Sequence, residues 1–585
     1  MSRFLNPPLL ICAALTLISV ASAAAETLSL PQFFSDHMVL QREGAAAIWG
    51  TAAPNTKVTV SFKGNTGSIQ SDAAGSWRTA VMTGPADAQG ADLTVEAGEE
   101  KITLEDVLVG EVWLASGQSN MVFSVGRVEA YADEIASADF PEIRFFLASM
   151  VTAVEPQTDI EGEWSLCSPE TVPDYSAVAY FFAKKLNQDL GIPIGVIKSA
   201  WGGKPVETFT SREALKTVPG TKAMVDVLLE ADAAYDPEQA QNFYAKRLTD
   251  WEAQIAKYKA TDSKERGRAP KKPAEPKRPL DTEGKPGVLF DSMINPFVGY
   301  TMRGAIWYQG EANAKAGAVP YDVTLPLMIN DWRARWDDDF SFYFVQLANF
   351  KEVATEPGNS DPWPLLQDRM RLVLGTTPKT GMATINDVGD ASDIHPKNKH
   401  DPGQRLARWA LAKDYGKNNL YSGPLYRTSK MRDGAMKVMF DQAGSGLQVR
   451  GKGSLKHFEI AGEDRVWHWA DAEIEGTDTV IVSCEEVPAP AAVRYAWAAN
   501  PEGANLVNSE DLPTSVFRTD DWDDVISQEA IETAAAAEER KVLQARIKEL
   551  AAQRQTLDRQ GDEFKKVAAE HAKLMEEWRA TAPKK

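Results

Sequence analysis

The most reactive pattern in the sequence surrounds Ser119, in residues 114–121 (Leu-Ala-Ser-Gly-Gln-Ser-Asn-Met). This segment directly follows an apolar run typical of a β-strand. Ligands of parallel sheets bind beyond the carboxyl ends of the strands, so a serine placed there would present its hydroxyl in a crevice. Its backbone amide would lie at a helix start, where it can stabilise an oxyanion. We interpret Ser119 as a candidate nucleophile, with a serine-rich turn that caps a helix as the simpler alternative.

A nucleophilic serine needs a base, and the chain has six histidines. Four of them lie in segments outside the predicted parallel sheet: His37, His457, His468 and His571. His395 and His400 remain, and His395 follows the strand-like run 382–385, again at a carboxyl end. His395 is therefore the candidate base.

Carboxylates surround this histidine in the sequence. Asp393 and Asp390 are both near enough to accept the imidazole N–H, hold its tautomer and stabilise the imidazolium. A loop histidine capped by a neighbouring aspartate is the simpler alternative. A metal site built from Asp387, Asp390, Asp393 and His395 is another.

Two further predicted strand ends carry groups suited to acyl transfer. Residues 199–204 contain the pair Gly202 and Gly203, which let the backbone approach a substrate closely. Residues 309–313 (Gln-Gly-Glu-Ala-Asn) follow another apolar run with three polar side chains. Together these segments supply a nucleophile, a base with an orienting carboxylate, and oxyanion donors.

The middle of the chain must position these groups, and its pattern predicts a three-layer α/β/α domain over residues 106–422. Short apolar runs alternate there with helical stretches at 176–190, 325–336 and 365–374. A helical segment and a run rich in Lys, Arg and Pro interrupt it at about 220–286. We interpret the basic run as a solvated connector, because it lacks the interleaved aromatic residues of a nucleic-acid site.

Other modules flank this domain. Residues 26–105 predict an antiparallel β-sandwich and residues 423–524 a second β module, because short alternating runs are separated by turn residues. Residues 525–585 predict a helical, coiled-coil-like tail. Its apolar residues at heptad spacing are Leu543, Leu550, Leu557 and Phe564. Either a helical hairpin docked on its own chain or a homo-oligomer seam would bury them.

Composition and the N-terminus limit the partners and the compartment. Acidic residues outnumber basic ones by 83 to 63 among 585 residues, and a net charge of −20 disfavours nucleic acid as a partner. Residues 1–25 resemble an export signal with small residues for cleavage, so we expect a periplasmic or secreted protein with no stable membrane anchor. Only Cys167 and Cys484 would remain, which excludes a disulfide-rich scaffold.

Several motifs, in this order, resemble those of the sialate O-acetylesterase family of the SGNH (GDSL-like) hydrolases. They are Gly-Gln-Ser-Asn-Met at 117–121, Trp-Gly-Gly at 201–203, Trp-Tyr-Gln-Gly-Glu-x-Asn at 307–313 and Asp-Ile-His-Pro at 393–396. The resemblance extends from about residue 28 to 524 and excludes the basic insert and the helical tail.

The resemblance implies a flavodoxin-like SGNH catalytic domain and a serine esterase that removes O-acetyl groups from carbohydrates without a metal or organic cofactor. By position, Ser119 matches the nucleophile and His395 the base. The oxyanion-hole residues fall on Gly202 or Gly203 and on Gln309 or Asn313.

The sequence departs from the SGNH pattern three residues before the histidine, where Ser392 replaces the usual acid. Asp393 is then the expected third member, and a Ser–His dyad supported by a backbone carbonyl remains open. Alternatives to a sialate esterase are an acetylxylan-type esterase and a non-catalytic sugar-binding protein. A sialic acid carboxylate would need a local cation such as Arg303 or Lys204.

Overall fold

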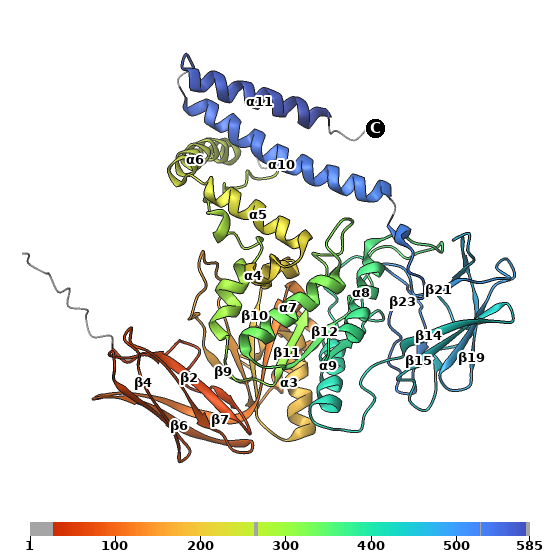
Figure 1. Ribbon diagram of the computed structural model, residues 1–585, viewed down its shortest axis with the longest axis horizontal. Helices are drawn as coiled ribbons and strands as arrows, with labels where there is room; N and C mark the ends of the chain where they lie inside the picture. Colours follow the sequence, from red (N-terminus) through yellow and green to blue (C-terminus); the bar gives the residue numbers. More distant parts are fainter. Residues whose placement is uncertain (1–26, 262–266, 527, 558, 581–585) are drawn as a thin grey trace, which may run out of the picture.

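The computed structural model describes residues 27–261, 267–526, 528–557 and 559–580. The predicted export signal, residues 1–25, lies outside the described residues. Figure 1 shows a central α/β body with N-terminal strands on one side, C-terminal strands on the other and long helices above it. No helix in the described ranges combines the length and the apolar character needed to cross a membrane.

The body is built on a sheet in the order β13-β12-β11-β7-β10-β8-β9. Its strands are β7 (Glu100–Gly117), β8 (Phe140–Leu147), β9 (Trp164–Cys167), β10 (Ile194–Ala200), β11 (Gly304–Tyr308), β12 (Ser341–Val345) and β13 (Thr380–Ala383). All neighbours pair in parallel except β8 and β9. The predicted parallel sheet is confirmed, and parallel pairing places the carboxyl ends of β7, β10, β11 and β13 along one edge.

Helices pack on both faces of this sheet. They are α1 (Ser119–Val122), α2 (Ala132–Ala136), α3 (Ala177–Leu190), α4 (Arg212–Leu215), α7 (Tyr321–Trp336), α8 (Pro362–Thr376) and α9 (His400–Lys413). Along β11, Ala305 and Trp307 join the apolar cluster that includes α7 and α8, whereas Ile306 and Tyr308 join the cluster of α3 and α9. This alternation places one helical layer on each face, because successive side chains of a strand point to opposite sides.

The sequence predicts where α3 begins and where it ends. Ser176 is its N-cap, and the Ser176 hydroxyl accepts the backbone N–H of Ala179. Gly191 ends the helix in the left-handed conformation with φ 65°. A hydroxyl acceptor at the start and a glycine just past the last turn satisfy backbone groups that the helix itself leaves unpaired.

β7 links the N-terminal strands to the body. Its first half pairs with β6, and its second half pairs with β10 and β11. The domain boundary predicted between residues 105 and 106 therefore falls inside one continuous strand. The other N-terminal strands are β1 (Val39–Gln41), β2 (Ala45–Thr51), β3 (Lys57–Phe62), β4 (Asn65–Gln70), β5 (Ser76–Met82) and β6 (Asp87–Ala97).

The C-terminal strands form small antiparallel sheets on the far side of the body (Figure 1). They are β14 (Leu425–Arg432), β15 (Ala435–Asp441), β16 (Gln448–Val449), β17 (Phe458–Ala461), β18 (Trp467–Trp469), β19 (Asp471–Glu475), β20 (Thr479–Ser483), β21 (Ala492–Tyr495), β22 (Leu506–Val507) and β23 (Phe517–Arg518). Their buried residues form a separate apolar cluster that includes Val438, Val480 and Phe517.

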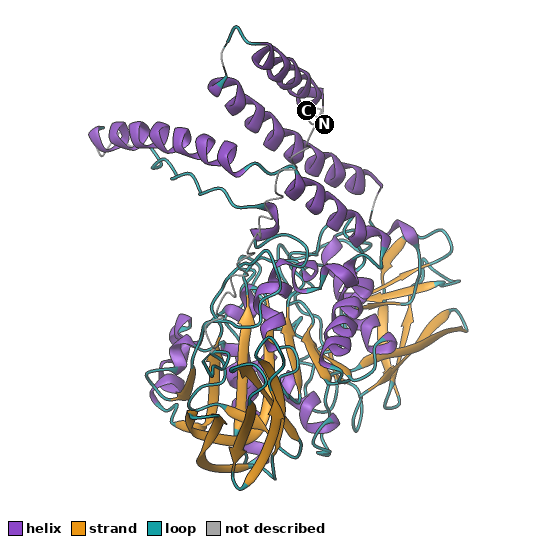
Figure 2. Cartoon of the chain, turned by 60° about the vertical axis from the view of Figure 1, so that its left-hand side comes forward, coloured by secondary structure: helices purple, strands orange, loops and turns teal. Residues whose placement is uncertain are grey.

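Long helices form an arm that projects from the body, as Figure 2 shows. The insert after β10 contributes α5 (Pro219–Ala233) and α6 (Pro237–Ala260), and the tail contributes α10 (Gln528–Thr556) and α11 (Asp562–Ala580). The tail turns back on itself near Gly561, and the Gln553 amide donates to Gln239 of α6 at 2.9 Å. The tail therefore lies against its own chain as a helical hairpin.

Candidate active site

Ser119 begins α1, immediately beyond the carboxyl end of β7. The turn before it requires glycine at position 117, where φ is 135° and an added Cβ would lie 2.3 Å from the Tyr308 carbonyl oxygen. The Gln118 N–H donates to this carbonyl at 2.9 Å. A sharp strand-to-helix turn thus presents the serine hydroxyl at the edge of the sheet.

His395 lies in the loop between β13 and α9 and reaches Ser119. The distance from His395 Nε2 to Ser119 Oγ is 2.8 Å, and the histidine side chain is 34% exposed. Its Nδ1 lies 3.4 Å from Asp393 Oδ1, which also accepts the His395 backbone N–H at 2.9 Å. With the ring proton on Nδ1, Nε2 is free to accept the serine proton.

The other aspartates of this loop are engaged elsewhere. Asp390 accepts the backbone N–H and the hydroxyl of Ser392, both at 2.8 Å. Asp387 forms ion pairs with Arg405 and Arg450. In the described part of the chain no three His, Cys, Asp or Glu residues are grouped to hold a metal ion. The geometry therefore gives the metal alternative no support, because its four candidate ligands do not converge.

Gly202 lies directly against the nucleophile. A Cβ added at Gly202 would approach Ser119 Cβ to 3.3 Å, and Gly203 beside it is left-handed with φ 69°. The preceding Trp201 N–H donates to the Gly117 carbonyl at 3.1 Å and holds the two strand ends together. Among the described residues, no backbone carbonyl accepts the N–H of Ser119 or of Gly202. Both N–H groups are available to an oxyanion.

Gln309 is held in a buried network beyond the end of β11. Its Oε1 accepts the Tyr321 hydroxyl at 2.6 Å, and its Nε2 donates to Asn313 Oδ1 at 2.7 Å and to the Lys204 carbonyl at 3.2 Å. The Asn313 amide donates in turn to Glu207. Asn313 thus supports Gln309 from behind, and its described hydrogen bonds do not include Ser119.

The residues that sequence reasoning missed lie beneath the nucleophile. Asn120, the residue after Ser119, donates to Glu311 Oε1 at 2.5 Å and to the Ile394 carbonyl at 3.1 Å. Its carbonyl oxygen accepts the fully buried Lys399 ammonium at 2.5 Å. One carboxamide therefore ties together the nucleophile turn, the end of β11 and the histidine loop. Asn120 and Glu311 lie within the noted motifs, whereas Lys399 has no spacing that signals it.

Burial favours the neutral forms of the two ionisable side chains in this network, Lys399 and Glu311. It lowers the pKa of Lys399 to about 7, although the charges of Glu311 and Asp393 act in the opposite direction. It also raises the pKa of Glu311, against hydrogen bonds and the Lys399 charge, which lower it. Perturbed ionisable groups of this kind gather at functional sites, because catalysis needs groups that titrate near the working pH.

An aromatic ring closes the side of the site next to His395. The Phe123 ring centroid lies 6.5 Å from that of the imidazole, with the two planes at 27°. The exposed Arg127 guanidinium lies 4.4 Å from the Phe123 centroid. Neither residue carries a sequence signal beyond its place shortly after the nucleophile.

The structure places one suggested substrate cation far from the site. Arg303 precedes β11 and its backbone N–H donates to the Val112 carbonyl, so it lies at the amino edge of the sheet, opposite Ser119. Its guanidinium is paired with the buried Glu111. The suggestion of Arg303 is wrong, because residues that begin and end parallel strands lie at opposite edges. Lys204 follows the Gly202–Gly203 turn, and its ammonium lies 3.6 Å from Glu283.

Comparison with known proteins identifies the family. No family model matches the chain. The sialate O-acetylesterase of Rattus norvegicus is 28% identical over 530 residues, covering 83% of this chain and 92% of the rat protein. The human sialate O-acetylesterase is 27% identical over 514 residues, covering 80% and 87%.

A crystal structure of a carbohydrate acetylesterase from Xanthomonas citri is 34% identical to this chain, with a TM-score of 0.70. The match covers 84% of this chain and all of that one. The chain belongs to the same family as this carbohydrate acetylesterase, and it is similar to the sialate O-acetylesterases. Family members are carboxylic ester hydrolases, and the Ser119–His395 contact in this esterase has the geometry that acyl transfer requires.

Proposed function

We propose that this chain is an exported serine esterase that removes O-acetyl groups from carbohydrates, with O-acetylated sialic acids as the main substrates. The observation that carries the proposal is the 2.8 Å contact between Ser119 Oγ and His395 Nε2 at the carboxyl edge of the parallel sheet. The names of the relatives support an acetyl ester on a sugar. The signal-like residues 1–25 support export to the periplasm or the medium.

In the first half of the reaction, Ser119 Oγ attacks the acetyl carbonyl while His395 Nε2 takes the serine proton. The N–H groups of Ser119 and Gly202 donate hydrogen bonds to the tetrahedral oxyanion and so stabilise it. Gln309 supports this region through its buried hydrogen-bond network. The ester C–O bond then breaks, His395 donates its proton to the departing sugar oxygen, and the acetyl group stays on Ser119.

In the second half, water attacks the acetyl-serine while His395 accepts a proton from it. The acyl bond to Ser119 Oγ breaks, His395 returns the proton to the serine, and acetic acid leaves and releases its own proton to water as acetate. Asp393 orients the imidazole and stabilises its charged form through Nδ1.

The proposal includes an SGNH-type three-layer catalytic domain flanked by β-sandwich modules. The apolar clusters on the two faces of the central sheet support the three layers. Assembly of a homo-oligomer through the tail stays a prediction.

The test is acetate release by the purified protein from an aryl acetate, acetylated sialosides, acetylated xylan and acetylated pectin. Ser119→Ala should lower kcat by about 10⁴-fold or more, because loss of a nucleophile removes the acyl-enzyme route. Ser124→Ala, a serine in the same segment, is the matched control and should keep its activity. Wild-type turnover in Ser119→Ala would overturn the nucleophile assignment, and a strict preference for xylan would favour an acetylxylan-type esterase.

A further inference from the structure

The cations near the active site differ in what they contact. Lys399 is buried and donates to Asn120. Lys204 is paired with Glu283, and Arg303 lies at the opposite edge of the sheet. Each of these charges is already committed to a partner within the protein or lies away from the nucleophile.

Arg127 differs from these three cations. It ends the short 3₁₀ helix Val125–Arg127, its side chain is exposed, and within the described ranges no carboxylate forms an ion pair with it. The Phe123 ring backs its guanidinium at 4.4 Å and restricts its motion. Because the same ring lies 6.5 Å from the imidazole of His395, the guanidinium and the imidazole are at most about 11 Å apart. One sugar unit with its acetyl group spans a gap of this size.

We propose that Arg127 binds the carboxylate of an acidic acetylated sugar and directs the acetyl ester to Ser119. A guanidinium presents a planar fork of N–H donors that matches a carboxylate in a bidentate way. The protein carries a net charge of −20, so an anionic sugar needs a local cation at the site to offset the repulsion. The inference rests on the proposed function and names the residue that selects its substrates. Sialic acids and uronic acids share the required chemistry.

The experiment compares each acidic substrate with its own neutral form. One arm uses an O-acetylated sialoside and its carboxyl methyl ester, and the other uses an O-acetylated glucuronoside and its methyl ester. The measured quantity is the ratio of kcat/KM for the acid to kcat/KM for the ester. Wild type should favour the acid by about 10-fold in at least one arm, which then identifies the class of sugar; one bidentate charged contact supplies about 1.4 kcal/mol or more.

Substitutions at Arg127 sharpen the test. Arg127→Gln should reduce the ratio to about 1, Arg127→Lys should keep part of it, and Arg127→Glu should reverse it. Arg432→Gln, an exposed arginine in the C-terminal strands, is the matched control and should retain the wild-type ratio. Circular dichroism verifies that each variant is folded.

The outcomes separate this inference from the proposed function. If wild type hydrolyses acid and ester equally well, or if Arg127→Gln keeps the preference, the carboxylate contact is wrong while the esterase assignment stands. If the protein hydrolyses none of the four sugars, the proposed function fails and this inference fails with it.

Discussion

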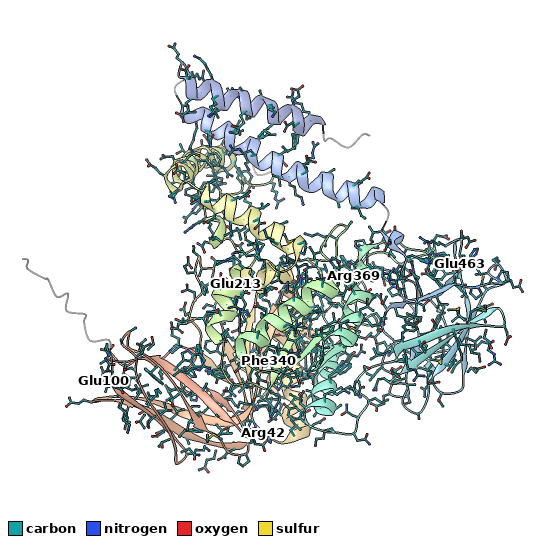
Figure 3. All side chains as sticks on the ribbon, in the orientation of Figure 1. Arg42, Glu100, Glu213, Phe340, Arg369 and Glu463 are labelled. Carbon is teal, nitrogen blue, oxygen red and sulfur yellow. The ribbon has the colours of Figure 1, made fainter. Side chains whose placement is uncertain are left out.

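Each edge of the central sheet contains buried ionisable side chains, but these side chains have different kinds of partner at the two edges. At the amino edge, the buried Glu111 carboxylate receives Arg303 Nε at 2.7 Å and Arg42 Nε at 2.5 Å. Arg42 is labelled near the lower end of the body in Figure 3. At the carboxyl edge, the Asn120 carboxamide lies between Glu311 and Lys399 and forms a hydrogen bond with each.

The pairing decides the ionisation. Burial opposes the charge of Glu111, yet hydrogen bonds from Arg303 and Arg42 lower its pKa below the ordinary value. Burial likewise opposes the charge of Arg303, and the Glu111 carboxylate raises the Arg303 pKa above its ordinary value. At the carboxyl edge, burial prevails and moves the pKa values of Glu311 and Lys399 toward neutrality. A carboxylate in direct contact with a guanidinium thus stays charged, as does the guanidinium. A carboxylate and an ammonium joined through a neutral amide can still titrate.

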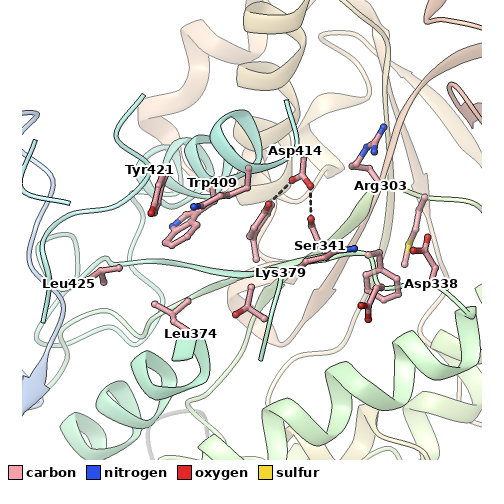
Figure 4. A pocket seen from close by; sticks show the side chains of 15 residues that line it. Arg303, Asp338, Ser341, Leu374, Lys379, Trp409, Asp414, Tyr421 and Leu425 are labelled. Atoms are coloured by element: carbon pink, nitrogen blue, oxygen red, sulfur yellow. Dashed lines mark hydrogen bonds between the residues drawn. The ribbon is translucent and has the colours of Figure 1, made fainter. Parts of the chain in front are cut away.

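The amino edge also contains a substantial hollow. A cavity of about 630 Å³ lies there, and at its wall Asp414 accepts the hydroxyls of Ser341 and Tyr343. Figure 4 shows Asp414 beside Ser341. Its lining includes Trp409 and Tyr421 but no histidine or cysteine. A large hollow therefore does not by itself mark the chemistry, which depends on a nucleophile and a base in contact.

The largest expected effect on stability is at the amino edge. Glu111→Gln should lower the free energy of unfolding by about 3 kcal/mol, because it removes the buried carboxylate that Arg303 and Arg42 share. Urea denaturation measures this loss, and kcat on an aryl acetate should stay at the wild-type value. Glu311→Gln is the matched variant at the other edge and should lower kcat with a smaller loss of stability. If both variants lost stability and neither lost kcat, the expected difference between the two edges would be wrong.

The second expected effect separates the two aspartates near His395. Asp393→Asn should lower kcat by about 100-fold, because the imidazole loses the acceptor that holds its tautomer. Asp390→Asn should change kcat by about threefold or less, since Asp390 only holds the loop through Ser392 and the Asp393 N–H. Steady-state kinetics on an aryl acetate measures both. Equal, small losses would favour a Ser–His dyad.

The smallest effect concerns how stability depends on pH. Between about pH 7 and the ordinary lysine pKa, the unfolded chain keeps the Lys399 proton while the folded protein releases it. The unfolded state binds more protons in this window, so stability should rise with pH by at most about 1.4 kcal/mol per pH unit from this residue. Lys399→Met should remove that contribution. Urea midpoints at pH 7, 8 and 9 measure it, and parallel pH profiles for both proteins would contradict the assignment.

Local patterns predicted those parts of the molecule whose causes are local. α3 could be bounded from Ser176 and Gly191, because capping depends on residues at the helix ends themselves. Ser119 and His395 could be singled out as residues after strands, since strand ends in a parallel sheet share an edge. The suggestion of Arg303 failed because Arg303 precedes the first residue of β11 and therefore lies at the amino edge of the sheet, away from Ser119.

The sequence alone determined which groups could react, how the chain is divided into elements and which edge of the sheet would hold the site. These depend on residue type and short-range spacing. Only the tertiary structure decided the contacts. Ser119 and His395 are 276 residues apart in the sequence, yet their side chains lie 2.8 Å apart. Asn120, Glu311 and Lys399 belong to three separate segments, and Asn120 forms a hydrogen bond with each of the other two. Such contacts, and the pKa shifts that follow from them, arise from packing between distant segments, which no local pattern encodes.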